Sequence, residues 1–332
     1  MATIYEVAKT AGVSLTTVSR VINGNSKVRE STRTKVLDAM QQLDYRPNAI
    51  AQSLASNRTN SIGIMVSELD GPFFGLMMAA IEQELRKAGK HVIITTGHSD
   101  QTREKEGIDF LISRKCDAII AHVEAVSDEY LIEINQGKTP VYLISRYVEA
   151  IADKCVSLDN KMGGYLATKN LIENNHRDIA YVSGPMFKAD AVDRLTGHKR
   201  ALAEFDIPFN EELFFVGDFK ETGGQQALKH FLSTNRSFTA IVCSNDEMAS
   251  GAMKYAREHS ISIPQELSII GYDNVIFANY LYPRLTTITN PVDKMGSMAA
   301  RLVLQDCYQL PTLAVEHLFT PSLKVRDSVY PI

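Results

Sequence analysis

Carboxylates, an amide, a guanidinium and aromatic rings recur in this sequence where short apolar runs give way to polar residues. The side chains of this kind are Phe73, Phe74, Asp190, Arg194, Asn245, Asp246 and Asp273. Their polar groups suit the hydroxyls of a polyhydroxylated ring, and their aromatic faces suit its apolar side. If the fold brings them together, they form a site for a sugar-like small molecule.

Each of these residues also has a purely local explanation. Asn245 or Asp246 can cap the N-terminus of a helix, and Asp273 can form a turn. Phe73 and Phe74 can be core residues. The residue types alone therefore leave local and binding roles open.

A second set of side chains, close to the N-terminus, is suited to nucleic acid. Arg20 can pair bidentately with guanine O6 and N7 in the major groove. Short hydroxyls and amides at Ser14, Thr17, Ser19 and Asn23 can reach phosphates, which fixes register without reading sequence. The alternative is a helical bundle that binds protein, in which the same groups are solvated or cap helices.

Charge is distributed unevenly along the chain. The 332 residues have a net charge of −4, but residues 1–60 contain eight basic and four acidic side chains. This segment therefore has a charge of +4, and the remainder has −8. A basic head suggests a polyanionic partner, although a modest positive excess is also common on solvated helical faces.

Three short helices must position the N-terminal set. Thr3 and Glu6 have the spacing of a capping box, and Gly12 is suited to end the first helix. Ser14 is a good N-cap for a second helix, predicted from Leu15 to Val21 or beyond. The side chains outside its apolar stripe are Leu15, Thr16, Ser19 and Arg20.

A third helix is predicted from about Ser31 to Leu43, with Val36, Leu37, Met40 and Leu43 on one face. This face would close a small core of three helices, which is the helix-turn-helix plan. In that plan the N-terminal part of the second helix enters the major groove of DNA.

From Ser61 onward, short apolar runs alternate with amphipathic helices, as in βαβ units with a parallel sheet. The predicted strands are Ile62–Val66, Val92–Thr95, Ala118–Ala121, Val141–Ser145, Ile179–Ser183, Ala240–Cys243 and Leu267–Tyr272. They divide into two similar halves, with helices such as Phe74–Ala88 between strands. In open α/β sheets, ligands bind beyond the carboxyl ends of the strands, so polar residues there are the first candidates for a site.

Several function classes are disfavoured by motifs that the sequence lacks. It has no GxxxxGK[ST] phosphate loop and no GxGxxG, HExxH or GxSxG motif, so we expect no enzyme. The four cysteines form no CxxC pair, so we expect reduced, mostly buried thiols, no metal and no cofactor. A carboxylate acid/base pair that turns over a bound sugar is the main alternative, and an unregulated sugar-binding protein is another.

We expect a cytoplasmic protein without a membrane partner. No apolar run is long enough to span a bilayer. The first residues, MATIYEVAKTAGVS, lack the continuous apolar segment of a secretory signal.

The stretch TIYEVAKTAGVSLTTVSRVINGN, followed by STRTKVLDAMQQLDYRPNAIAQSLA, resembles the N-terminal signature of the LacI/GalR family of transcriptional repressors. By this resemblance Leu15, Thr16 and Arg20 occupy the base-reading positions of the recognition helix. Tyr45 and Asn48 match residues that contact the DNA backbone.

The segment PNAIAQSLAS, residues 47–56, resembles the hinge helix of that family, which orders when two subunits meet over the minor groove at the operator centre. Leu54 matches the apolar wedge that enters a central base step and kinks the duplex, and Ala51 lies one turn earlier on that face. The alternative is a linker whose Leu54 packs against the body.

The resemblance extends through the body, in the runs SIGIMV, DRLTGHKRAL, FTAIVCSNDEMASGAM, LSIIGYDN and PRLTTI. It implies a periplasmic-binding-protein-like core. The effector-contact positions that it implies are Phe73, Phe74, Arg146, Asp190, Arg194, Phe219, Asn245 and Asp273. The run SDQTREKEGIDFLISRKCDAIIAHVEA is most similar to the galactose and β-glucoside repressors, which favours a sugar effector over a purine.

The resemblance also implies an α/β protein with an all-α head. Its expected parts are a helix-turn-helix domain at 1–46, a hinge helix and linker at 47–60, and an effector-binding and dimerisation core at 61–332. Within the core, the expected lobes are an N-lobe at about 61–158 and 291–319 and a C-lobe at about 159–290 and 320–332.

The expected function is repression of carbohydrate-utilisation genes. A homodimer would bind a palindromic operator in the nucleoid, and a sugar effector would switch its affinity. A nucleoside, a purine or a sugar phosphate is the alternative effector.

Overall fold

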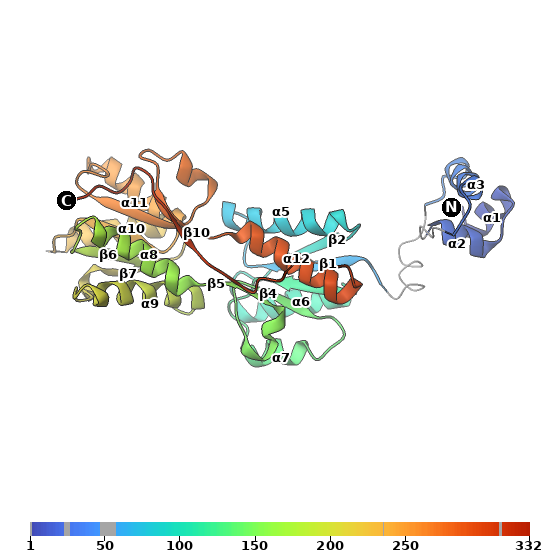
Figure 1. Ribbon diagram of the computed structural model, residues 1–332, viewed down its shortest axis with the longest axis horizontal. Coiled ribbons are helices and arrows are strands. Elements are labelled where there is room, and N and C mark those ends of the chain that lie inside the picture. Colours follow the sequence, from blue (N-terminus) through green and yellow to red (C-terminus); the bar gives the residue numbers. More distant parts are fainter. Residues whose placement is uncertain (1, 23–26, 47–57, 235, 312–313) are drawn as a thin grey trace. The chain divides into compact units, whose positions relative to one another are not determined.

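The computed structural model describes residues 2–22, 27–46, 58–234, 236–311 and 314–332. The chain divides into two compact units, Met1–Asn60 and Ser61–Ile332, each with its own core (Figure 1).

The described part of the first unit is a bundle of α1 (Ile4–Ala11), α2 (Leu15–Ile22) and α3 (Glu30–Gln42). The predicted capping box is present on α1: the Thr3 amide donates to Glu6 Oε2 at 2.7 Å, and the Glu6 amide donates to Thr3 Oγ1 at 3.4 Å. Gly12 ends this helix with a left-handed φ of 64°, as predicted from its lack of a side chain.

The core of the bundle is formed by small and β-branched residues. Val7, Val18 and Val36 are fully buried. Of the apolar stripe predicted on α2 from Val18, Val21 and Ile22, the two valines are buried and Ile22 is partly buried. The prediction that Leu37 belongs to the core is wrong, because its side chain is 50% exposed. The buried face of α3 instead continues from Val36 to Ala39, one helical turn later.

The second unit consists of two lobes, each built around a six-stranded sheet (Figure 1). The strands of the N-lobe are β1 (Ser61–Val66), β2 (His91–Thr96), β3 (Ala118–Ala121), β4 (Val141–Ile144), β5 (Cys155–Leu158) and β11 (Leu318–Phe319). Its helices are α5 (Pro72–Lys87), α6 (Gln101–Ser113), α7 (Asp128–Ile134), η1 (Glu149–Lys154) and α12 (Val292–Tyr308). The strands run parallel in the order β11-β5-β4-β3-β1-β2.

The C-lobe repeats this plan with one antiparallel edge strand. Its strands are β6 (Ile179–Ser183), β7 (Phe214–Val216), β8 (Ala240–Cys243), β9 (Ser268–Asp273), β10 (Thr286–Thr289) and β12 (Ser322–Lys324). Its helices are α8 (Asn160–Glu173), α9 (Ala189–Glu204), η2 (Glu211–Leu213), α10 (Glu221–Ser233), α11 (Asp246–Glu258) and η3 (Ile276–Asn279). The sheet order is β12-β10-β9-β8-β6-β7, and β12 pairs antiparallel with β10.

Each sheet is covered by helices on both faces, which explains why its central strands are almost wholly apolar. Along β8, Val242 packs into the cluster formed with α8 and α9, whereas Ile241 and Cys243 pack into the cluster formed with α10 and α11. This alternation follows from the two-residue period of a strand. A strand that is buried on both faces reads as a continuous apolar run.

All seven predicted strands are present, but the sequence did not indicate β5, β7, β10, β11 or β12. The predicted parallel sheets are confirmed, and β12 is an antiparallel edge strand paired with β10. The four cysteines are free and buried, as predicted.

The chain passes between the lobes three times. It leaves the N-lobe between β5 and α8, returns between β10 and α12, and leaves again between β11 and β12. Among the described residues, no helix is long and apolar enough to cross a membrane.

Candidate functional site

The first candidate site is the outer face of α2 in the head. Leu15, Thr16 and Arg20 are exposed on it, which is the orientation needed for contact with a base edge. Leu15 is 37% exposed, whereas Val18 on the opposite face is fully buried.

Two of the predicted phosphate contacts have a local role at the start of the same helix. Ser14 Oγ accepts a hydrogen bond from the Thr17 amide at 3.2 Å, and the two hydroxyls lie 2.9 Å apart. Ser14 therefore caps α2, and its side chain is exposed as well. Ser19 and Tyr45 are half-buried, and Tyr45 packs against the core of the head.

Four predicted DNA contacts lie outside the described residues. They are Asn23, Asn48, Ala51 and Leu54.

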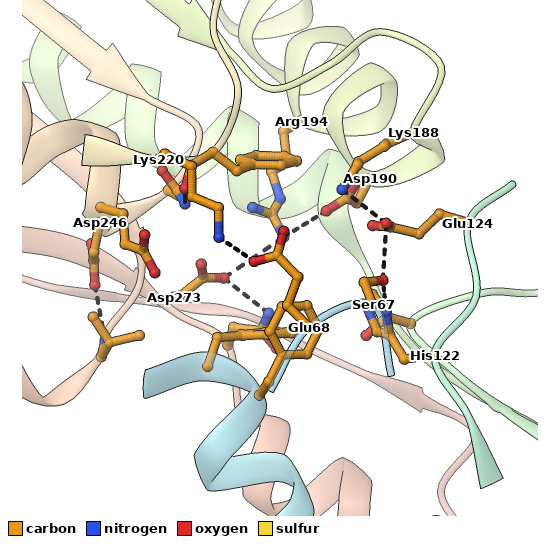
Figure 2. A pocket seen from close by; sticks show the side chains of 18 of the residues that line it. Ser67, Glu68, His122, Glu124, Lys188, Asp190, Arg194, Lys220, Asp246 and Asp273 are labelled. Carbon is orange, nitrogen blue, oxygen red and sulfur yellow. Dashed lines mark hydrogen bonds and ion pairs between the residues drawn. The ribbon is translucent and has the colours of Figure 1, made fainter. Parts of the chain in front are cut away.

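The second candidate site is a cavity between the two lobes of the core, with a volume of about 840 Å³ including its mouth (Figure 2). The predicted residues that line it are Phe73, Phe74, Asp190, Arg194, Phe219, Asn245 and Asp273. Asp273 is at the end of β9, Asn245 lies between β8 and α11, and Arg194 is on α9. The cavity thus lies where the parallel-sheet rule places a ligand.

Arg194 is the most highly connected side chain of the cavity. Its Nε donates to Asn160 Oδ1 at 2.9 Å and its Nη1 to the Ser244 carbonyl at 2.5 Å. Its Nη2 lies 3.4 Å from Asp190 and 3.7 Å from Asp273. The Tyr272 ring lies under the guanidinium, at 3.8 Å from the ring centroid. Arg194 is only 4% exposed, so these contacts hold a fixed positive charge inside the cleft.

Burial changes the pKa of the Asp273 carboxyl group. Burial raises its pKa to about 6, while Arg194 and a hydrogen bond from Asn290 Nδ2 at 3.1 Å act in the opposite direction. Its φ of 104° is one that side-chain-bearing residues rarely adopt. The Asp273 side chain is therefore only 10% exposed and its backbone is conformationally constrained at the ligand-facing edge of the sheet.

Asn245 and Asp246 lie at the cavity wall and also perform the local roles that the sequence allowed. Asn245 Oδ1 accepts from the Met248 amide at 2.9 Å, which caps α11, and its Nδ2 donates to the Phe219 carbonyl at 2.8 Å. Asp246 accepts from Thr287 Oγ1 at 2.6 Å and from the Val275 amide at 2.9 Å. Their hydrogen bonds thus hold the loops around the cavity in place.

Aromatic rings border the cavity on both lobes. Phe73 and Phe74 from the N-lobe form an edge-to-face cluster with His122, in which the Phe74 and His122 centroids lie 5.3 Å apart. Phe219 from the C-lobe has a φ of 66° and its ring fits against Gly184, where an added Cβ would collide with it. These rings provide apolar faces from both sides of the cleft.

Two ion pairs join the lobes across the cavity (Figure 2). Lys188 Nζ of the C-lobe lies 2.8 Å from Glu124 of the N-lobe. Lys220 of the C-lobe likewise pairs with Glu68 of the N-lobe. Burial raises the pKa of Glu124, but His122, Lys188 and Ser99 outweigh this effect and lower it overall. Glu124 is therefore ionised when it pairs with Lys188.

Two close helix crossings position the C-lobe side of the site. At Gly164 on α8 and Gly197 on α9, an added Cβ would collide with the backbone of the facing helix. Gly224 on α10 and Gly251 on α11 form a similar crossing on the other face of the sheet. Since α9 carries Arg194 and α11 follows Asn245, the glycines fix the distance of both helices from the cavity.

Arg146 is the predicted effector contact that does not line this cavity. Its Nη2 forms an ion pair with Asp128 at 2.6 Å, and it borders a neighbouring cavity instead.

Several cavity residues were missed by the sequence reasoning. They are Ser67, Glu68, His122, Glu124, Asn160, Lys188, Lys220 and Asn290. Ser67 and His122 directly follow β1 and β3, so the strand-end rule applied to every strand would have found them. Asn160 and Asn290 lie at crossings between the lobes, a position that only the three-dimensional arrangement reveals.

Comparison with known proteins places both units in one family. Residues 3–48 match the family model for bacterial regulatory proteins of the lacI family, and residues 168–329 match a periplasmic binding protein-like domain. The HTH-type transcriptional regulator GalR of Salmonella typhimurium strain LT2 is 40% identical over 329 residues, which cover 99% of this chain and 96% of GalR. The HTH-type transcriptional repressor PurR of Glaesserella parasuis is 34% identical and is matched over 98% of its length, with 99% of this chain covered.

A solved structure shows the same architecture. The lac repressor dimer bound to operator and the anti-inducer ONPF superposes with a TM-score of 0.87 at 27% identity, and 99% of each chain is covered. The similarity thus extends through the three-helix head and both lobes of the core. The chain belongs to the lacI family of bacterial regulatory proteins.

Proposed function

We propose that this chain is a DNA-binding transcriptional repressor that acts as a homodimer and whose operator affinity is set by a small sugar in the cleft between its lobes. One observation carries the proposal: the chain is similar to a transcriptional regulator over 99% of its length. Within that length it keeps Leu15, Thr16 and Arg20 exposed on one face of α2.

The head supplies the DNA contacts in this proposal. Two heads in a dimer place two α2 helices in successive major grooves, which requires an operator with approximate two-fold symmetry. Arg20 reads a guanine, and Ser14 and Thr17 position the helix on the phosphates.

The lining of the cavity favours a neutral effector over a phosphorylated one. Three basic side chains, Lys188, Arg194 and Lys220, face a larger set of carboxyl groups. The acidic residues of that set are Glu68, Asp70, Glu124, Asp190, Asp218, Asp246, Glu247 and Asp273. A phosphate group would meet this negative excess, whereas sugar hydroxyls can donate to carboxylates and accept from Arg194.

The ion pairs between the lobes provide a link between sugar binding and the heads. Glu68 and Glu124 line the cavity and hold the C-lobe lysines, so a ligand that competes for these carboxylates alters the preferred closure of the lobes. A coupling free energy of roughly 1–3 kcal/mol is enough to change operator affinity about 5- to 150-fold.

The first test is a thermal unfolding screen of the full chain against hexoses, glycosides, sugar phosphates and purine nucleosides. A ligand present at about 100 times its Kd stabilises the native state by roughly 2.7 kcal/mol, which raises the midpoint. We expect neutral sugars to raise it and the phosphorylated forms to have no effect. If only the nucleosides raised the midpoint, the effector would be a purine-type molecule and not a sugar.

The second test measures binding of fluorescent palindromic duplexes by anisotropy, with and without the stabilising sugar. We expect a change in operator affinity and recovery of the sugar unchanged, as judged by NMR. Conversion of the sugar into a product would instead identify an enzyme. Absence of binding to any palindromic duplex would overturn the repressor assignment.

A further inference from the structure

Glu104 is a buried carboxylate that lies outside the cleft. It is on α6, is only 1% exposed and lines neither the cavity nor its neighbour. A charged group is costly to bury unless the surrounding protein satisfies its hydrogen bonds. The partners of Glu104 therefore indicate what this side chain does.

Three consecutive backbone amides donate to the Glu104 carboxylate. Its Oε1 accepts from the Glu124 amide at 2.9 Å, and its Oε2 accepts from the Ala125 and Val126 amides at 2.9 and 2.8 Å. The three amides belong to the loop between β3 and α7, where no strand or helix provides their acceptors. Successive N–H groups that converge on one anion form a nest, so the carboxylate fixes the course of this loop.

The same loop carries the N-lobe partner of an ion pair between the lobes. Glu124 Oε2 lies 2.8 Å from Lys188 Nζ and accepts from Ser67 Oγ at 3.1 Å (Figure 2). The Glu124 and Lys188 side chains are 13% and 14% exposed, so the walls of the cleft leave them little freedom to follow a displaced loop. The ion pair therefore depends on where the backbone of Glu124 is held.

Close packing confines the Glu104 side chain on its other side. A Cβ at Gly97 would lie 2.5 Å from Glu104 Cγ and 2.6 Å from Met65 Cε. Gly97 directly follows β2, so this strand end approaches Glu104 more closely than a larger residue would allow. The side chain is thus held between the end of β2 and the loop after β3.

We propose that Glu104 is a positioning residue for the contact between the lobes: it places Glu124 opposite Lys188 and thereby sets how firmly the cleft is held closed. It does so without touching a ligand in the cavity. Its consequence for operator affinity rests on the proposed function, which links closure of the lobes to the heads. The placement of Glu124 does not depend on that function.

Acylation of Lys188 in the full chain measures this contact without ligand or DNA. An N-hydroxysuccinimide ester modifies accessible amino groups, and peptide mass spectrometry gives the rate at each lysine. Glu104→Gln keeps the shape of the side chain but turns an NH2 group towards the loop, so at least one amide loses its acceptor. We expect Lys188 to react about tenfold faster, the factor that corresponds to the loss of one hydrogen bond to a charged group. Lys254, which is 43% exposed and pairs with Glu221 within the C-lobe, is the internal reference.

Control variants separate positioning from a general loss of stability. Glu106→Gln removes the same charge from an exposed position on the same helix and should leave the Lys188 rate unchanged. Tyr142→Phe removes a buried hydrogen bond of the N-lobe, from Tyr142 Oη to Asp306 Oδ2 at 2.9 Å, and should lower the thermal midpoint without accelerating Lys188. Glu104→Asp keeps the charge but shortens its reach, so it should produce a smaller increase than Glu104→Gln.

A double mutant tests whether Glu104 acts through Glu124. Glu124→Gln weakens the ion pair directly and should accelerate the acylation of Lys188 by itself. Glu104→Gln added to Glu124→Gln should then have little further effect, because the contact through which Glu104 acts is already lost. The same fold-increase in both backgrounds would give Glu104 a purely structural role and overturn the proposal.

The outcomes also separate this inference from the proposed function. An unchanged Lys188 rate in both folded Glu104 variants, or an equal increase in Tyr142→Phe, would overturn the positioning role whatever the chain binds. Absence of binding to every palindromic duplex and every sugar would overturn the proposed function alone, because acylation of Lys188 requires neither.

Discussion

Arg194 organises the cleft because its guanidinium is buried between carboxylates, an amide and an aromatic ring. A buried charge of this kind depends on every partner, since removal of one partner leaves the others unpaired. The same contacts that hold Arg194 in place also leave Asp190 and Asp273 aimed into the cavity.

Replacement of Arg194 by Met should therefore destabilise the core as well as abolish sugar binding. We expect the free energy of unfolding to fall by roughly 3–5 kcal/mol, because Asp190 and Asp273 lose their counter-charge. The loss should be smaller when Arg194→Met is combined with Asp273→Asn, as measured by urea denaturation of both variants and of each single mutant. Additive losses in the double mutant would show that the two residues are not energetically coupled.

Asp273 predicts a specific pH dependence of stability. Its pKa is 3.8 in the unfolded chain and is raised to about 6 by burial in the fold, so between these values the folded state binds the additional proton. The free energy of unfolding should therefore fall as the pH rises through this window and become level above it. Asp273→Asn removes this decline.

The pH dependence of stability is compared between the native chain and Asp273→Asn, and the difference between them is the contribution of Asp273. His198, whose pKa burial lowers to about 3, acts in the opposite direction, but it is present in both proteins. Urea denaturation at several pH values between about 4 and 7 measures the two slopes. Parallel profiles for the native chain and Asp273→Asn would contradict the prediction.

Arg20→Ala should weaken operator binding by about 1–3 kcal/mol and relax the preference at one base pair. The reason is the loss of a bidentate contact to a base edge. Lys35→Ala, on the exposed face of α3, is the control for loss of positive charge in the head. Anisotropy titrations against operators mutated at each position measure the preference, and an unchanged preference would remove Arg20 from base reading.

The sequence predicted which side chains line the cavity where they stand at the end of a strongly apolar strand, as Asn245 and Asp273 do. It could not be predicted where the partner comes from the other lobe. Lys188 and Lys220 are unremarkable in the sequence, and only the fold brings them opposite Glu124 and Glu68.

At the scale of elements, the glycine crossings between α8 and α9 determine where Arg194 lies. A Cβ at Gly164 would collide with the backbone of Arg194 itself. The two helices therefore approach more closely than side chains would allow, which brings the start of α9 to the edge of the cavity.

Gly164→Ala should force α8 and α9 apart. We expect a loss of about 1–3 kcal/mol in the free energy of unfolding, typical of overpacking, together with weaker sugar binding. The matched control is Gly75→Ala on α5, where an added Cβ has no atom within 4 Å. There the better helix propensity of alanine should stabilise the protein by up to about 1 kcal/mol. Equal thermal midpoints for the two variants would contradict the role of the crossing.

Elements with strong local signals were predicted well. β3, β6 and β8 begin and end at the predicted residues, because each is a short, fully buried apolar run. β7, β11 and β12 have two or three residues each and are partly exposed, so they lack both length and apolar pattern. Pairing with distant segments stabilises such strands, and a local pattern does not contain that information.

At the scale of the whole molecule, the two units have separate cores and separate proposed tasks. The head is built around Val7, Val18 and Val36, whereas the core has its own clusters in both lobes. The sequence indicated this division through its charge and its change of pattern near Ser61. It did not indicate the neighbouring cavity beside Arg146, because the walls come from segments far apart in the chain.

Removal of residues 1–60 should abolish operator binding and leave sugar binding intact. The remaining chain, 61–332, keeps every residue of both cavities and its own hydrophobic clusters. Anisotropy with operator DNA and calorimetry with the sugar measure the two activities separately. Loss of sugar binding in the truncated chain would show that the units do not function independently.

The three crossings between the lobes also determine when each lobe can be completed during synthesis. The N-lobe lacks α12 and the edge strand β11 until residues 292–319 have left the ribosome, and the C-lobe lacks β12 until residues 322–324 follow. The three described helices of the head are synthesised long before, since α3 ends at residue 42. A nascent chain therefore carries the three described helices of the head while both lobes are still unfinished, and responsiveness to a ligand is acquired only with the last tenth of translation.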